Sequence, residues 1–239
     1  MRPDVSSLKL FYNRPIGRGV AACLSQKIST HWSSISSLDV MGIGYPLPVM
    51  DNLLASGADL FALMPGGQGA AVWPDEKHGR SILIDEYHLP FEDGSIDRIF
   101  LMHAIEYAHQ PAAFLRECWR VLKPGGRLLV LVPNRRRAWS ALEHTPFGQG
   151  TPYSSRQMQK QLEDQLLYPV HVSSALMMPP FMLPGIEKMM KVSELALRGS
   201  FEMLGGLLFI EAEKRVYSRL TPPPKRQGVR VLSGVSPRV

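Results

Sequence analysis

The stretch "DEYHLPFEDGSIDRIFLMHAIEYAHQPAAFLRECWRVLKPGGRLLVLVPN", residues 85–134, decides the fold of this 239-residue chain. Within it, "SIDRIFLM" predicts a buried strand, and "QPAAFLRECWRVL" predicts a helix with an apolar face. The inner face of this helix carries Phe114, Cys118, Val121 and Leu122. "KPGG" ends the helix, and "RLLVLVPN" predicts a strand that is apolar on both sides. A strand, a helix and a second strand in this order predict two parallel strands with the helix packed on the sheet.

The alternation of strands and helices continues on both sides of this stretch. Upstream, we expect a helix over residues 14–35, a strand in "SSLDVMGIGYP", a helix in "VMDNLLASG", and strands in "ADLFALMP" and "GRSILIDE". Downstream, after a long loop, we expect helices in "SSRQMQKQLEDQL" and "GIEKMMKVSELALR" and a late strand in "GGLLFIEAEKRVY". The predicted fold class is α/β: a Rossmann-like, mostly parallel sheet with helices on both faces, a helical lid after the fifth strand and an antiparallel late strand.

Residues 85–134 also resemble the class I S-adenosylmethionine-dependent methyltransferases, in the group with a small-molecule-type methyltransferase domain. An acid precedes "LPF", an acidic turn leads into the strand that contains Asp97, and "RVLKPGG" follows in the same order as in that family. The likeness covers residues 37–135, and the later "TPFGQGTPY" is similar to a poorly characterised bacterial subgroup. The resemblance implies a methyltransferase that uses S-adenosyl-L-methionine as its cofactor and acts on a small-molecule acceptor.

We expect three parts along the chain. They are an N-terminal helical segment at residues 1–36, a methyltransferase-like domain at 37–217 with its lid at about 136–205, and a basic, disordered tail at 218–239. The net charge is +6, and the tail contains five basic residues and no acid, so the rest of the chain is nearly neutral. Nucleic-acid binding through the tail and Arg135–Arg137 is therefore only a third hypothesis. The arginine run could instead bind an anionic substrate or be a solvated surface.

A cofactor site is predicted at the carboxyl ends of the strands, where ligands bind in open α/β sheets. The first four strands would bring Gly44, Met64, Asp85 and His103 to this edge. Backbone N–H groups around Gly42 and Gly44 can hold the methionine carboxylate of the cofactor, because glycine has no Cβ to block the approach.

The resemblance implies further contacts with the adenine ring. The Asp85 carboxylate would accept a hydrogen bond from the adenine amino group, and the backbone of Glu86 would face a ring nitrogen. Leu89 and Phe91 would line the adenine slot. Each assignment has a structural alternative, because Asp85 could cap a turn and the two apolar side chains could belong to the core.

Two features depart from the family pattern. The glycine loop has Pro46 where a third small residue is usual, and the end of the second strand lacks the acid that grips the ribose hydroxyls. The nearest acid, Asp59, lies at the start of that strand. We expect Gln68 to bind the ribose instead, with a bond about 1 kcal/mol weaker than a charge-assisted one. These departures leave open a second hypothesis, a non-catalytic methyltransferase-like partner or regulatory protein.

Three residues are predicted to act in catalysis. Methyl transfer needs alignment and, for a hydroxyl or a protonated amine acceptor, a general base. His103 is the first candidate for the base, and Asn134 could orient the acceptor. Tyr153 and His144 lie in the long loop that could fold over the site. His103 could equally be a hydrogen-bonded structural residue, and we expect Glu106 to be exposed.

The remaining features bear on partners and location. The methionines Met177, Met178, Met182, Met189, Met190 and Met203 gather in the C-terminal half and predict an adaptable lid or a protein contact such as a homodimer. Cys23 and Cys118 match no metal spacing, so we predict no metal site and two reduced thiols. Because the sequence has no secretory pattern and no apolar run of about 18 residues, we expect a cytoplasmic protein without a membrane span.

Overall fold

The computed structural model describes residues 2–77, 79–177 and 205–216. These residues form a seven-stranded sheet with the order β3-β2-β1-β4-β5-β7-β6. The strands are β1 (Asp39–Gly44), β2 (Asp59–Pro65), β3 (Ser81–Ile84), β4 (Ile96–Met102), β5 (Leu122–Pro133), β6 (Leu167–Ala175) and β7 (Leu207–Lys214). β1 to β5 pair in parallel, and β7 runs antiparallel to both β5 and β6. The strand order reverses where β1 lies beside β4.

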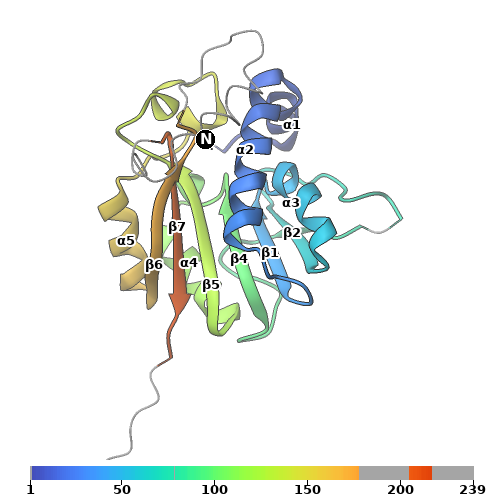
Figure 1. Cartoon of the computed structure of the whole chain (residues 1–239), viewed down its shortest axis with the longest axis vertical. Helices are drawn as coiled ribbons and strands as arrows, with labels where there is room; N and C mark the ends of the chain where they lie inside the picture. The colour runs from blue at the N-terminus through green and yellow to red at the C-terminus, as the bar shows by residue number, and fades with distance from the viewer. Residues whose placement is uncertain (1, 78, 178–204, 217–239) are drawn as a thin grey trace, which may run out of the picture.

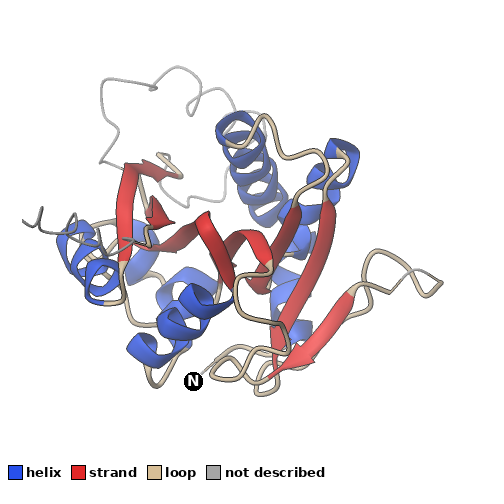
Figure 2. Cartoon of the chain, turned by 90° about the horizontal axis from the view of Figure 1, so that it is seen from below, coloured by secondary structure: helices blue, strands red, loops and turns tan. Residues whose placement is uncertain are grey.

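Helices cover both faces of this sheet (Figure 1 and Figure 2). They are α1 (Val5–Asn13), α2 (Pro15–His31), α3 (Leu47–Leu53), α4 (Pro111–Val121) and α5 (Ser155–Asp164), with short 3₁₀ turns at Leu54–Ser56, Ile105–Tyr107, Ala138–Ala141 and Pro146–Gly148. The buried side chains of α1, α2 and α3 belong to one apolar cluster, and those of α4 and α5 belong to another. Alternate strand residues serve the two clusters, so that Val40 faces the first and Met41 the second.

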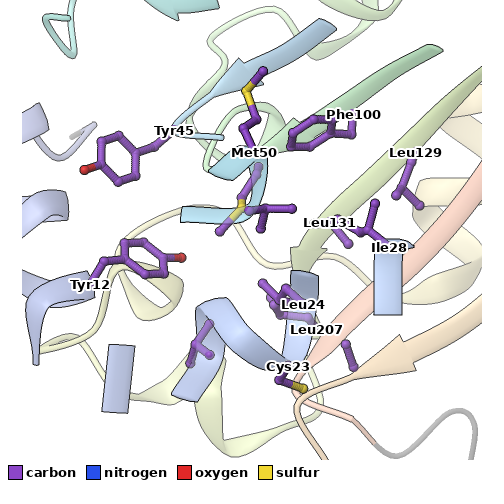
Figure 3. Packing of buried hydrophobic residues seen from close by; sticks show 14 of the residues in the cluster. Tyr12, Cys23, Leu24, Ile28, Tyr45, Met50, Phe100, Leu129, Leu131 and Leu207 are labelled. Carbon is purple, nitrogen blue, oxygen red and sulfur yellow. The ribbon is translucent and has the colours of Figure 1, made fainter. Parts of the chain in front are cut away.

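Helix α2 is fixed to the sheet by fully buried aliphatic side chains. Figure 3 shows Ile28 of this helix beside Leu131 and Leu129 of β5, and Leu24 and Cys23 toward Leu207 of β7; Phe100 of β4 belongs to the same cluster. Leu24, Ile28, Phe100 and Leu129 have no exposed surface. Because burying one such side chain contributes roughly 2 kcal/mol, this cluster attaches the N-terminal helices firmly to the sheet.

The predicted fold class is confirmed. The strands expected on either side of the 85–134 stretch are present, and α5 begins behind a serine cap at Ser154 as predicted. The expected late strand is β7, which is antiparallel. It lies between β5 and β6 and therefore is not the edge strand.

Two described elements were not predicted. Helix α1 precedes the predicted N-terminal helix, and β6 lies inside the region predicted as a helical lid. Strand β6 contains Pro169 and His171, and its register with β7 shifts between them. Apolar and polar residues alternate only weakly in this segment, so the sequence pattern does not indicate a strand.

Several predictions fall wholly or partly outside the described residues. The helix at 185–198, the tail at 218–239 and all the clustered methionines except Met177 lie there. The proposed domain boundaries stay predictions. Among the described helices, none combines the length and the apolar character that crossing a membrane requires.

A buried carboxylate on β7 joins α2 to the sheet. Glu211 is 1% exposed, accepts a hydrogen bond of 2.7 Å from Trp32 Nε1 and one of 3.0 Å from Arg127, and lies 3.1 Å from His31 Nε2. Burial opposes ionisation of this carboxyl, but His31, Trp32 and Arg127 outweigh it and lower its pKa to about 2.

We predict that this interaction makes stability pH-dependent in acid. Because the folded pKa of Glu211 lies below its ordinary value of 4.5, the contribution is full above that value and is lost as pH falls through 4.5 toward 2. Between about pH 6 and about pH 3, the free energy of unfolding should fall more steeply in the wild type than in Glu211→Gln, by about 2 kcal/mol. Urea unfolding followed by tryptophan fluorescence measures this. Glu213→Gln, on the same strand, should keep the wild-type slope, and equal slopes for Glu211→Gln would contradict the assignment.

Candidate functional site

The carboxyl ends of β1 to β4 meet at one edge of the sheet. β1 ends at Gly44, Met64 lies one residue from the end of β2, and Asp85 and His103 directly follow β3 and β4. The predicted placement of these four residues is therefore confirmed. Asp59 is the first residue of β2 and lies at the opposite edge, also as predicted.

The glycines of the β1 loop allow the chain to pack closely on itself. A Cβ at Gly42 would lie 2.5 Å from Pro46 Cβ and 2.7 Å from Phe100 Cζ. A Cβ at Gly44 would lie 2.2 Å from the carbonyl oxygen of Met102, and the φ of +102° at Gly44 disfavours any other residue. The space beside both glycines is thus filled by atoms of this chain.

The N-terminal segment lies across the ends of β2 and β3. Both terminal nitrogens of the Arg2 guanidinium donate to the buried Glu86 carboxylate, Nη2 over 2.7 Å. The backbone N–H of Val5 donates to the carbonyl oxygen of Gln68 over 2.9 Å. Glu86 and Gln68, both predicted to bind the cofactor, are therefore hydrogen-bonded to Arg2 and Val5.

Gln68 retains one unused acceptor. Its Nε2 donates to the carbonyl oxygen of Gly44 over 2.8 Å, which joins the ends of β1 and β2. Its Oε1 is buried and has no hydrogen-bond partner among the described residues. A buried acceptor at this position fits the predicted contact with a ribose hydroxyl, because it lacks only a donor.

Asp85 and Leu89 both make structural contacts in this fold. Asp85 Oδ1 accepts from the backbone N–H of Tyr87, and Oδ2 lies 2.9 Å from His88 Nδ1. These contacts, His88 first, lower the pKa of Asp85. The carboxylate is still half-exposed and can accept further hydrogen bonds. Leu89 is buried in the apolar cluster that covers the α4 face, and Met64 is fully buried in the other cluster.

His103 lies between a tyrosine hydroxyl and a carboxylate. The Tyr12 hydroxyl is 2.7 Å from His103 Nε2, and Glu106 Oε1 is 3.6 Å from Nδ1. The second Glu106 oxygen accepts from the backbone N–H of Ala104 over 3.0 Å. Burial, reinforced by Tyr45 and Glu106, raises the pKa of Tyr12, so its hydroxyl stays protonated and shares a hydrogen bond with Nε2. A carboxylate, an imidazole and a hydroxyl in this order can move a proton between them.

The expectation that Glu106 is exposed is wrong. The 3₁₀ turn Ile105–Tyr107 directs its carboxylate inward, and the side chain is 3% exposed. His103 itself has φ of +53°, a backbone conformation that non-glycine residues rarely adopt. His103 Nδ1 and Glu106 Oε1 have no hydrogen bond within the described ranges. Strain and unsatisfied buried groups are typical of functional sites.

Phe147 covers the far side of His103. The ring centroids of Phe147 and His103 are 4.7 Å apart, and those of Phe147 and Phe11 are 6.0 Å apart. Trp139 packs edge-on against Phe147 with centroids 5.4 Å apart. The loop after β5 and helix α1 therefore meet over the end of β4.

Sequence reasoning missed Tyr12 and Phe147. Leu8, Phe11 and Tyr12 have the i, i+3, i+4 spacing of a buried helix face, so a signal for Tyr12 was present. Phe147 lies in an irregular loop without periodicity, and no comparable signal identifies it.

Asn134 and Tyr153 come together at the end of β5. They form an isolated parallel bridge, and the Asn134 side chain donates to the carbonyl oxygen of Gly205 and accepts from the backbone N–H of Arg136. Tyr153 is buried, and it lines a cleft of about 550 Å³. Neither side chain is hydrogen-bonded to His103 in the described parts of the chain. His144, in the same loop, is exposed.

Four clefts formed by described residues have volumes of about 550, 390, 410 and 170 Å³. None of these four is lined by Gly42, Gly44, Gln68 or Asp85. The cleft of about 390 Å³ lies between the N-terminal helices and α3 and is lined in part by Tyr12.

Comparisons with known proteins point to one family. Residues 39–130 match the family described as a methyltransferase domain. A probable S-adenosylmethionine-dependent methyltransferase from Mycolicibacterium smegmatis is 39% identical over 70 residues, which are 29% of this chain and 26% of that protein. The match therefore spans about a quarter of the relative's length.

Solved structures share the fold over most of the chain. A methyltransferase from Thermotoga maritima, described as a possible histamine N-methyltransferase, has a TM-score of 0.64 at 16% identity and covers 88% of this chain and 96% of its own. The cyclase SpnF has a TM-score of 0.54 at 17% identity over 81% of this chain and 80% of its own. At such identities the likeness concerns the fold, and a cyclase and a methyltransferase share it.

We predict that Tyr12→Phe destabilises the protein by about 1–2 kcal/mol, because it leaves Nε2 of the buried His103 without its hydrogen-bond partner. Urea unfolding measures the loss. Tyr45→Phe is the matched control: its ring stacks on Tyr12 at 5.8 Å, and its hydroxyl makes no hydrogen bond within the described ranges. The control should lose less than about 0.5 kcal/mol. Equal losses in the two variants would show that the Tyr12–His103 hydrogen bond is unimportant.

Proposed function

We propose that this chain, which belongs to the class I S-adenosylmethionine-dependent methyltransferase family, transfers a methyl group from S-adenosylmethionine to a small-molecule acceptor. The observation that carries the proposal is the family match over residues 39–130. This range includes Gly44, Gln68 and His103, which lie at the edge where ligands of open α/β sheets bind.

For the cofactor contacts we propose the same residues that the sequence predicts. Backbone groups at Gly42 and Gly44 would face the methionine carboxylate, and Gln68 Oε1 would accept from a ribose hydroxyl. The half-exposed Asp85 carboxylate and the backbone of Glu86 would face adenine. Met64, Leu89 and His103 would supply the surrounding surface. The unpaired, buried Oε1 of Gln68 is the contact that the structure supports most directly.

His103 is the proposed general base. S-adenosylmethionine, when bound, supplies a methyl group already activated on a sulfonium. As the acceptor loses its proton to the Tyr12 oxygen, the hydroxyl proton of Tyr12 passes to His103 Nε2 along the existing 2.7 Å contact. The Glu106 carboxylate beside Nδ1 then stabilises the imidazolium. Asn134 and Tyr153 would orient the acceptor at the end of the next strand, β5.

Cofactor binding would require movement of the N-terminal segment. Arg2 and Val5 hold Glu86 and Gln68, and these are two of the residues that adenosine would contact. The ion pair between Arg2 and Glu86 is the main polar contact to break. We therefore propose that residues 2–5 leave the edge when the cofactor enters.

A second candidate function is a non-catalytic partner or regulatory protein with the methyltransferase fold. The same N-terminal contacts favour it, together with the filling of the glycine loop by Pro46 and Phe100. In this case the segment over Gln68, Glu86 and His103 would be a permanent part of the core. Cofactor binding discriminates between the two functions.

The first test is thermal unfolding of the full chain with S-adenosylmethionine, S-adenosylhomocysteine or ATP. A ligand at about 100 times its dissociation constant adds roughly 2.7 kcal/mol of stability. For a protein of this size, the midpoint should rise by roughly 5–10 °C with both S-adenosyl compounds and stay unchanged with ATP. No shift with the S-adenosyl compounds at millimolar concentration would overturn the enzyme proposal and favour the partner function.

A second test concerns the N-terminal segment. Arg2→Ala removes the competing ion pair, so the affinity for S-adenosylhomocysteine should rise about fivefold, the equivalent of about 1 kcal/mol. Isothermal titration calorimetry measures it. Lys9→Ala removes one positive charge from an exposed position in the helix that follows this segment and should leave the affinity unchanged. If Arg2→Ala weakens binding, or changes it no more than Lys9→Ala does, the segment does not compete with the cofactor.

A further inference from the structure

Five basic side chains gather around two adjoining clefts at the end of β5. Arg135, Arg156 and Lys160 line the cleft of about 550 Å³, and Arg136 and Arg137 line the cleft of about 410 Å³. Arg156 and Ser154 line both clefts, so the two adjoin. We call this surface, Arg135–Arg137 with Arg156 and Lys160, the basic cleft.

Three arginines of the basic cleft have no acidic partner among the described residues, whereas its lysine has one. Lys160 pairs with Asp164 at 2.9 Å. No carboxylate of the described residues pairs with Arg135, Arg136 or Arg156, and the buried Nε of Arg137 has no hydrogen bond there. Arg120, by contrast, is paired with Glu117 and Asp93. The uncompensated charge indicates a surface that receives an anion.

The backbone beneath the basic cleft is held by hydrogen bonds. Arg135 N–H donates to Tyr153 O over 2.9 Å, and Tyr153 N–H donates to Pro133 O over 3.0 Å. Arg137 N–H donates to Asn134 O over 3.0 Å, and Asn134 Oδ1 accepts from the N–H of Arg136. The positions from which the guanidiniums extend are thus fixed, which lowers the entropy lost on binding.

The start of α5 adds to the positive potential. Ser154 and Gln157 form a capping box, and the first turn of the helix contains no acid. The amino end of this helix therefore lies at the basic cleft together with Arg156. This contribution is secondary to that of the arginines.

We propose that the basic cleft binds a small molecule through a phosphate or diphosphate group. Guanidinium groups match phosphate oxygens in paired hydrogen bonds, and several uncompensated arginines suit a group with more than one negative charge. The cleft of about 550 Å³ has the size of a small-molecule site. It also contains Tyr153, and Asn134 lines its neighbour, so the bound molecule is the methyl acceptor; this last step rests on the proposed function.

The experiment is calorimetric titration of the full-length protein with inorganic pyrophosphate at an ionic strength of about 0.15 M, where the Debye length is about 8 Å. Wild type should bind it, and Arg135→Ala and Arg156→Ala should each lower the affinity at least tenfold. Lys77→Ala is the matched control, since Lys77 is exposed in the loop between β2 and β3 and its loss removes the same charge. The control should stay within about twofold of wild type, because screened distant charges interact weakly.

Three results would overturn the inference. They are no binding of pyrophosphate by wild type at millimolar concentration, an equal loss in Lys77→Ala, and tighter binding of a single-stranded oligonucleotide that weakens steeply with salt. Thermal unfolding of Arg135→Ala with S-adenosylhomocysteine separates this inference from the proposed function. If Arg135→Ala loses pyrophosphate binding but keeps the wild-type thermal shift with S-adenosylhomocysteine, the proposed role of the basic cleft is supported. If wild type binds pyrophosphate but shows no thermal shift with S-adenosylhomocysteine, the enzyme proposal and the acceptor assignment are refuted, and anion binding by the basic cleft stands.

Discussion

Where β1 lies beside β4, the chain leaves the two strands toward opposite faces of the sheet. The connection from β1 enters α3 on one face, and that from β4 enters α4 on the other. In such sheets a crevice opens at the carboxyl ends of the strands at this point, and either a ligand or another part of the chain fills it. Here α1 and the loop around Phe147 cover it, and Tyr12 and Arg2 bond to two of its polar side chains, His103 and Glu86. The conformations of His103, Gln68 and Glu86 all depend on this cover.

The sheet itself was predictable because its strands are buried on both faces. Continuous apolar runs such as that of β5, bounded by glycine and proline, carry a strong signal that does not depend on distant residues. The sequence signal of strand β6 is weak, since this strand contains Pro169 and pairs only with β7, which follows about 30 residues later in the sequence. An edge strand of this kind depends on its partner more than on its own composition.

The candidate site was predictable only in part. Strand ends fix which residues reach the edge, so Gly44, Asp85 and His103 could be placed there. What covers the edge could not be derived, because Tyr12 lies 91 residues from His103 in the sequence. Glu106 was misjudged for a similar reason: a carboxylate in a polar turn is usually exposed, and only the 3₁₀ turn brings it to the backbone N–H of Ala104.

The two ends of the carboxyl edge differ in how their charges are compensated. At β3 and β4, Glu86 is paired with Arg2 and Glu106 lies beside His103, so these buried charges have partners already. A further anionic group there would lie next to two buried carboxylates and meet a large desolvation cost. At β5 the arginines of the basic cleft lack acids within the described ranges. An anionic ligand would therefore place its charge at β5 and its neutral, reacting part toward β4, where the dry surroundings of His103 favour alignment over solvation.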